Sequence, residues 1–127
     1  MRKLLTDAHV RLLRAMRGAI AADVWFDPWL GDPTAAGPSL VIEDFSSEPW
    51  ASLTFMGMRH RVDIRLRGPR GEVENAYDRL RSLMTEPDID LPGHFLAEIE
   101  MVDARGEIHA DDSMQMSLRY EALTIEE

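Results

Sequence analysis

Residues 58–67 alternate between apolar and charged side chains. One face carries His60, Val62, Ile64 and Leu66, and the opposite face carries Arg59, Arg61, Asp63, Arg65 and Arg67. A period of two predicts a β-strand with one buried face and one open face. Four arginines on the open face of a chain with a formal net charge of -9 need acidic partners. We therefore expect these acids in a neighbouring strand or in a neighbouring subunit, and a protein that assembles more than one built around a reaction.

Helical spacing marks two other segments, residues 6–22 and 72–85. In both, apolar residues recur three and four positions apart, which predicts amphipathic helices with one face on a core. Thr6 is the expected N-cap of the first helix, and Pro87 is expected to stop the second. The predicted core stripes are Leu5, His9, Leu12, Leu13, Met16 and Ile20 in the first helix, and Val73, Ala76, Tyr77, Leu80, Leu83 and Met84 in the second.

The segment between the two helices contains further strand and turn patterns. Residues 40–45 predict a short strand, and residues 46–49 predict a turn. Residues 50–56 are expected to begin the strand that continues through the arginine-faced segment, with Gly57 allowing a bulge.

The C-terminal part alternates again over residues 94–102 and 113–124. In the first strand, Glu98 and Glu100 are expected to face outward, and the inward residues are Phe95, Ala97, Ile99 and Met101. In the second, the inward residues are Met114, Met116, Leu118, Tyr120 and Ala122. Residues 103–112 are predicted to be a polar connection, so the two strands form a hairpin. Because opposite charges on paired strands stabilise each other, Glu98 and Glu100 are candidate partners of the arginines.

Residues 27–39 contain three prolines and two glycines, which predicts a loop without regular structure. Large apolar residues nevertheless occur in or just before it, namely Trp25, Phe26, Trp29 and Leu30. Such side chains either pack onto the core or wait for a partner, and both interpretations stay open at this point.

The order of elements is helix, two or three strands, helix, two strands. Both helices are amphipathic and each strand has one apolar face, which favours two packed layers. We predict an α+β fold in which an antiparallel β-sheet of about four to five strands packs two amphipathic helices on one face. Residues 1–127 are expected to form a single domain.

Little in the chain points to a reaction. There is no cysteine, which excludes a disulfide, a thiolate zinc site and a cysteine nucleophile. His9, His60, His94 and His109 lack the spacing of metal ligands, and neither a Gly-x-Ser-x-Gly elbow nor a phosphate-binding glycine loop occurs. We expect no catalytic, cofactor-binding or metal-binding residues, no cofactor and no enzyme activity. A site assembled from distant residues or between subunits is the remaining route to catalysis.

The charge distribution limits the partners. Residues 1–17 carry a net charge of +4, which leaves -13 for the rest of the chain. A strongly acidic body argues against tight binding of nucleic acid, because phosphate contacts need Lys and Arg. No uncharged apolar stretch approaches the roughly 20 residues that span a bilayer, so we expect no membrane partner.

Several segments occur in an order that is typical of one family. They are residues 24–27, 38–42, 54–64, 72–84, 90–94 and 117–124, together with Trp50. In this order they cover nearly the whole chain, and they resemble the tail-completion, or tail-terminator, proteins of long-tailed phages and phage-derived gene transfer agents.

The resemblance implies a structural role. Members of this family form a hexameric ring that caps the tail tube, stops its polymerisation and docks the head-tail connector or stopper protein. DNA passes through the ring without sequence-specific binding. By this resemblance the chain is made in the cytoplasm of a bacterial host and ends in the tail or neck of the virion.

A head-to-tail ring uses two different patches on each subunit, and this chain offers basic and acidic faces. The residues that we expect at subunit or partner contacts are Arg59, Arg61, Arg65, Arg67, Glu98, Glu100, Trp25, Trp29, Leu30, Trp50, Asp111 and Asp112. Two alternatives remain: another neck or minor tail protein such as a head-tail stopper, and a small cytosolic α+β binding module or enzyme.

Overall fold

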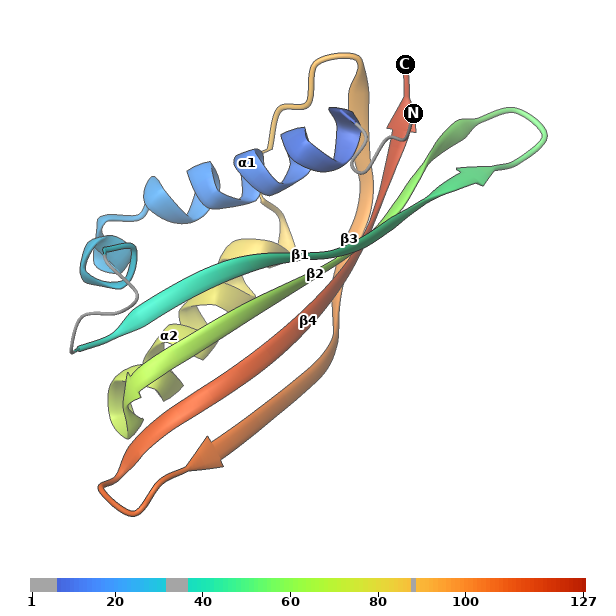
Figure 1. The fold of residues 1–127 in the computed structure, drawn as a ribbon. Coiled ribbons are helices and arrows are strands. Elements are labelled where there is room, and N and C mark those ends of the chain that lie inside the picture. The colour runs from blue at the N-terminus through green and yellow to red at the C-terminus, as the bar shows by residue number, and fades with distance from the viewer. Residues whose placement is uncertain (1–6, 32–36, 88) are drawn as a thin grey trace, which may run out of the picture.

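The computed structural model describes residues 7–31, 37–87 and 89–127 (Figure 1). Its elements, in chain order, are α1 (Asp7–Ala21), the 3₁₀ helix η1 (Val24–Trp29), β1 (Ser39–Ala51), β2 (Met56–Pro69), α2 (Arg70–Thr85), β3 (His94–Ile108) and β4 (Ser113–Glu126). The four strands form one antiparallel sheet in the order β1-β2-β4-β3.

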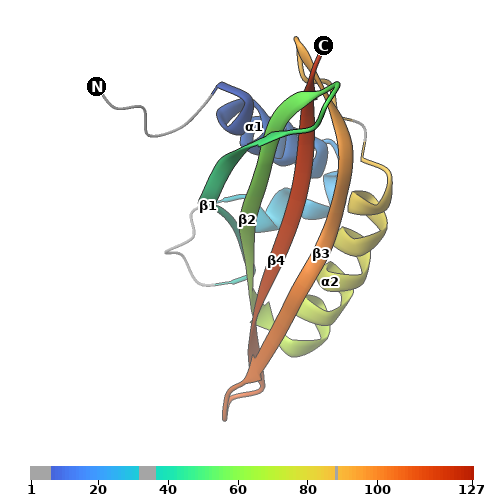
Figure 2. The ribbon, with the colours of Figure 1, turned by 90° about the vertical axis from the view of Figure 1, so that its right-hand side faces the viewer.

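Both helices lie on the same face of the sheet, and the opposite face is left uncovered (Figure 2). Helix α1 contacts β1 and β2, whereas α2 contacts β2, β4 and β3. The predicted α+β fold with two helices on one face of an antiparallel sheet is therefore confirmed, with four strands.

The core lies between the helices and the sheet, and the predicted stripes supply most of it. In α1 the buried residues include His9, Leu12, Met16 and Ile20; in α2 they are Val73, Ala76, Leu80 and Met84. Leu13, Tyr77 and Leu83 pack against this core while partly exposed. The expected cap Thr6 and the stripe residue Leu5 lie outside the described residues.

The prediction for the first strand was wrong in its length. Instead of a strand over 40–45 and a turn at 46–49, β1 runs without a break from Ser39 to Ala51. A register shift between Asp44 and Ser46 accommodates one extra residue, and Pro49 still pairs with Met58. Proline is tolerated here because β1 is an edge strand, where a missing N–H need not interrupt the ladder. The pairing with β2 thus overrides the local turn signal.

Gly57 has a different role from the predicted bulge. The register of β2 is regular here, with Gly57 opposite Trp50 of β1 and Ile125 of β4. A Cβ atom at this position would lie 1.9 Å from the backbone oxygen of Thr124. Glycine is needed because two backbones approach closely.

The prediction for β3 was wrong in the length of the strand and in which of its first residues face the core. The strand continues to Ile108, so the connection to β4 contains only residues 109–112. A register shift between Leu96 and Glu98 changes the face of the residues before it. Phe95, expected to be inward, is 43% exposed, and Ala97 is also exposed. Ile99 and Met101, after the shift, pack against the core as predicted.

Residues 24–29 form η1 instead of the irregular loop that was predicted to start at residue 27. Asp23 caps this helix by accepting a hydrogen bond from the Trp25 N–H (3.1 Å). Phe26 and Trp29 are buried in the core, at 0% and 2% exposure. Of the two interpretations of these aromatic residues, core packing is correct for Trp29, which is therefore not available to a partner.

The length and hydropathy of the helices show whether any of them could span a membrane. Among the described residues, no helix is long and apolar enough to cross a membrane.

Candidate subunit interface

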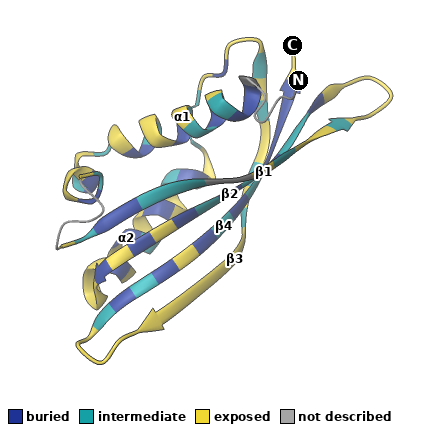
Figure 3. Cartoon of the chain, viewed as in Figure 1, coloured by how far each residue is buried: buried dark blue, intermediate teal, exposed yellow. Residues whose placement is uncertain are grey.

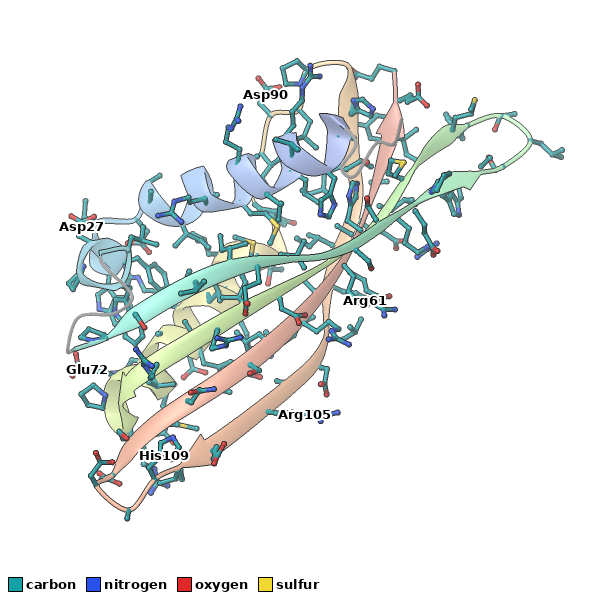
Figure 4. All side chains as sticks on the ribbon, in the orientation of Figure 1. Asp27, Arg61, Glu72, Asp90, Arg105 and His109 are labelled. Atoms are coloured by element: carbon teal, nitrogen blue, oxygen red, sulfur yellow. The ribbon has the colours of Figure 1, made fainter. Side chains whose placement is uncertain are left out.

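The uncovered face of the sheet carries the charged residues that the alternation predicted. Arg61 and Arg105 extend from the sheet on the side away from the helices (Figure 4). Arg65 and Arg67 of β2 are exposed, whereas Arg59 and Arg61 are half-buried. This face is the first candidate surface for contact with another subunit.

Acidic partners for the arginines come from the strands on either side of β2. Arg61 donates to Glu121 of β4 (2.9 Å), and Arg65 donates to Glu43 of β1 (2.6 Å). A third pair runs the other way, because Arg119 of β4 donates two hydrogen bonds to Asp63 of β2 (2.9 and 3.2 Å). The hydrogen bond to Asp63 raises the pKa of Arg119. We expected the acidic partners in a neighbouring strand or in a neighbouring subunit. For Arg61 and Arg65 the acids lie on neighbouring strands.

Glu98 and Glu100 do not supply these acids, contrary to prediction. Both lie on β3, and β4 separates β3 from β2. Glu100 is instead opposite Glu121, another acid. Both glutamates are exposed and make no ion pair with any described residue. They remain candidates for contact with another subunit.

The paired arginines contribute little stability of their own. The side chains of the three cross-strand pairs are all partly exposed to solvent. Exposed ion pairs contribute about 0–1 kcal/mol each, because water screens the attraction and ordering two long side chains costs entropy. Arg59 differs from Arg61 and Arg65, because it forms no ion pair within the described part of the chain.

Trp25 is held within its own subunit. Its ring stacks on Trp29, with 5.9 Å between centroids, and the Arg79 guanidinium lies 5.3 Å from its centroid. Arg79 also donates two hydrogen bonds to Asp23 (2.7 and 3.0 Å), and these lower the pKa of Asp23. Leu30, next to this cluster, is half-buried against the core. The cluster thus gives Trp25 contacts within its own subunit, and contact of Trp25 or Leu30 with a partner stays a prediction.

Asp111 and Asp112 shape the tip of the β3–β4 hairpin. Asp111 accepts hydrogen bonds from the N–H and hydroxyl of Ser113 (3.0 and 2.6 Å), which lower its pKa. Asp112 has φ 65°, in the left-handed region that a tight turn requires, and its carbonyl accepts from the Arg70 N–H (3.2 Å). Both acids therefore have local structural roles, while the Asp112 side chain stays 77% exposed.

Sequence reasoning missed a second candidate surface, at the turn between β1 and β2. Leu53, Phe55 and Met56 are exposed at 105%, 52% and 63%. With the half-buried Trp50 they form the end of a hairpin that projects beyond the helices (Figure 1). The signal was present as large apolar residues on both sides of Ser52 and Thr54. Residues 50–56 were predicted to begin a strand, and this was wrong, because β1 ends at Ala51 and β2 begins at Met56 with the turn between them.

A buried histidine pair joins α1 to the sheet. His9 Nδ1 lies 2.8 Å from His60 Nδ1, and His60 Nε2 lies 2.8 Å from Thr124 Oγ1. Burial, followed by the charges of His9 and His94, lowers the pKa of His60 to about 4. These residues lie in the core and link elements together. In the parts of the chain that are described, no group of three or more His, Cys, Asp or Glu side chains is arranged to hold a metal ion.

Comparison with known proteins shows that the fold of this chain is similar to that of a solved structure. No protein-family model and no curated protein matches the sequence. Among solved structures, the chain is similar to a chain of the "Virion of native gene transfer agent (GTA) particle", with a TM-score of 0.73 and 16% sequence identity. The likeness covers 90% of this chain and 94% of the other. At this identity the comparison establishes a shared fold over almost the full length of both chains.

Proposed function

We propose that this chain is a structural protein of a tailed phage or gene transfer agent particle. The observation that carries the proposal is the fold likeness to a chain of a gene transfer agent virion, which extends over 90% and 94% of the two chains. The resemblance of the sequence segments to tail terminators supports the same role independently of the fold.

More specifically, we propose a tail terminator: a homo-oligomeric, hexameric ring that caps the tail tube and joins it to the head connector. A ring needs two different contact patches on each subunit. The two edges of this sheet present different surfaces. One edge carries the projecting β1–β2 hairpin, and the other carries Glu98 and Glu100, which form no ion pair within the described part of the chain. On this proposal the chain has no enzymatic role and takes its place in the tail or neck of the virion.

DNA would pass through such a ring without binding to it. The net charge of -9 opposes phosphate contacts, and several exposed acids on β3 lack a cation within the described residues. These properties suit a passage for DNA better than a binding site for it.

Negative-stain imaging of the purified protein with and without its tail-tube protein, together with mass from light scattering, tests the proposal. We expect rings, either free or only at tube ends. Rings that bind the head connector but leave tube length unchanged would favour a head-tail stopper or another neck protein. A monomer that ignores the tube would contradict the proposal and favour a small binding module or enzyme.

A further inference from the structure

Three histidines from three different elements meet beneath the first turn of α1. His9 of α1 is 0% exposed and His60 of β2 is 1% exposed, and their rings stack with 5.0 Å between centroids. His94, the first residue of β3, is close enough to act on His60 electrostatically. The side of α1 that faces the sheet is buried and its outer side is exposed (Figure 3). The cluster therefore lies where α1 covers one end of the sheet.

The contact between the rings of His9 and His60 depends on how many protons they carry. The two Nδ1 atoms lie 2.8 Å apart, so one nitrogen must donate its N–H to the lone pair of the other. A charged imidazole carries a proton on both nitrogens and has no lone pair left to accept a hydrogen bond. If both rings were charged, two N–H groups would face each other and the hydrogen bond would be lost. The closed arrangement therefore excludes the doubly charged pair.

The described groups around His60 do not offset an added positive charge. From β4, the Thr124 hydroxyl lies 2.8 Å from His60 Nε2. On β2 itself, the neighbours Arg59 and Arg61 lie on the opposite face of the strand. His94 is a like charge when it is protonated, and its buried Nδ1 has no hydrogen-bond partner among the described residues. Burial, followed by the charges of His9 and His94, accordingly lowers the pKa of His60 to about 4.

Further polar contacts hold the start of α1 in place. The Arg11 guanidinium donates to the Pro92 carbonyl (2.7 Å), in the turn that leads to His94. On β1, the uncharged Ser47 pairs with His60. The first turns of α1 are therefore attached both to β2 and to the segment that begins β3.

We propose that His9, His60, His94 and Thr124 form a pH-sensitive switch, and that acid releases the first turn of α1 from the sheet while the rest of the fold stays intact. The remainder of α1 is anchored by Leu12, Met16 and Ile20, all at 0% exposure, and these apolar contacts do not titrate. A helix end also opens more easily than its middle, because its first N–H groups have no partner within the helix. The release is therefore confined to the residues before Leu12.

Release uncovers the inner face of the sheet beside the β1–β2 hairpin. His60 lies in a row with Ala122 of β4 and Ile99 of β3, which is the part of the sheet next to the start of α1. The switch operates within a single copy of the chain, whether or not copies assemble into a ring. It thus gives the molecule an acid-dependent change of surface at one end.

The pKa of His60 in the closed and released forms sets the size of the effect. In the closed form it is about 4, and in the released form the ring reaches water and regains its ordinary pKa of about 6.5. The equilibrium constant for opening therefore rises as the pH falls through 6.5 and levels off near pH 4. Between pH 7 and pH 5 we expect an increase of roughly 20-fold.

Amide hydrogen exchange of the full chain between pH 7 and pH 5, followed by NMR, tests the switch. The N–H groups of Arg11, Leu12 and Leu13 donate to carbonyls of the first turn, so their protection reports on its release. After correction for the intrinsic effect of pH on exchange, their protection factors should fall roughly 20-fold. A set of measurements in low urea separates local from global opening, because only opening that exposes much surface depends on urea.

We expect the exchange of these three amides to be independent of low urea concentrations at both pH values. The most protected amides of β4 should exchange faster as urea is added. If the amides of Arg11, Leu12 and Leu13 follow urea in the same way as those of β4, the whole fold opens and the proposal is wrong. Protection in α1 that does not change between pH 7 and pH 5 would also overturn it.

Two substitutions assign the effect to the histidine pair. His60→Asn keeps a polar amide beside His9 and does not titrate, so the 20-fold change should disappear. His9→Asn supplies a carboxamide oxygen that accepts from a charged His60, so the closed form tolerates the proton and the change should shrink. This second variant keeps the test decisive if the first does not fold. His109→Gln, at an exposed position, is the matched control and should keep the full change. An unchanged response to pH in a folded His60→Asn or His9→Asn variant would refute the switch.

Discussion

At the scale of single residues, the most consequential group is the buried pair His9 and His60. His60 is 1% exposed, and its two ring nitrogens contact His9 on α1 and Thr124 on β4. The neighbouring His94 at the start of β3 adds to the electrostatic cost of protonation, and the pKa of His60 falls to about 4. His60 therefore stabilises the fold in its neutral form, and its contact with His9 couples α1 to the sheet.

This pair predicts that stability decreases in mild acid. In the unfolded chain His60 has its usual pKa of about 6.5, so the unfolded state binds the proton first as the pH falls. The stabilisation is complete above pH 6.5 and is lost progressively down to pH 4. Between pH 7 and pH 5 we expect the free energy of unfolding to drop by about 2 kcal/mol. Urea denaturation followed by tryptophan fluorescence measures this drop.

Two variants separate this effect from the titration of other groups. His109→Gln, at an exposed position in the β3–β4 turn, should keep the same dependence on pH. His60→Leu should flatten it, whatever its effect on absolute stability. An unchanged slope in His60→Leu would show that His60 does not cause the loss.

At the scale of elements, η1 shows how tertiary contacts decide the role of a proline-containing segment. Pro28 lies inside η1, yet Phe26 and Trp29 on the same short helix are buried against the core. The helix packs against α1 and β1, and the Arg79 guanidinium of α2 lies over the ring of Trp25. We infer that η1 is a packing element and not a binding loop.

Truncation of Trp29 tests that inference. Trp29→Ala should lower the free energy of unfolding by about 3–5 kcal/mol, as is usual when a large buried aromatic side chain is removed. Val24→Ala, at a position on the same helix that is 76% exposed, should change it by less than about 0.5 kcal/mol. Equal effects of the two substitutions on the urea midpoint would show that η1 is not packed as described.

At the scale of the whole molecule, one face of the sheet is covered and the other is open. The helices bury the inner face. On the outer face, Arg61, Arg65 and Arg119 each form an ion pair with an acid on an adjacent strand. The open face is therefore largely neutralised within the subunit, whereas Glu98 and Glu100 of β3 form no ion pair with any residue that the structure describes.

This distribution predicts that the protein does not bind duplex DNA. Since neutralised arginines contribute few phosphate contacts and the net charge is -9, we expect a Kd weaker than about 10⁻⁴ M at physiological salt. Fluorescence anisotropy with a labelled duplex measures it. Tighter binding that weakens steeply as salt is added would contradict the prediction, because it would reveal a surface of cations available to phosphates.

Much of the fold follows from local periodicity. The stripes of α1 and α2 and the alternation of β2 and β4 predicted both the elements and their buried faces, because each pattern is complete within one segment. The sequence alone also determined that β2 would carry an open face of arginines. A residue's face within a regular element depends on its immediate neighbours in the chain, and these are visible in the sequence.

Only the tertiary structure decided what depends on partners distant in the chain. The order β1-β2-β4-β3 gave Arg61 and Arg65 the acids Glu121 and Glu43 in place of Glu98 and Glu100. Cross-strand pairing extended β1 through a sequence that resembles a turn, and a register shift turned Phe95 outward. Strand order, register and close backbone approach are set by packing between segments, and no single segment contains that information.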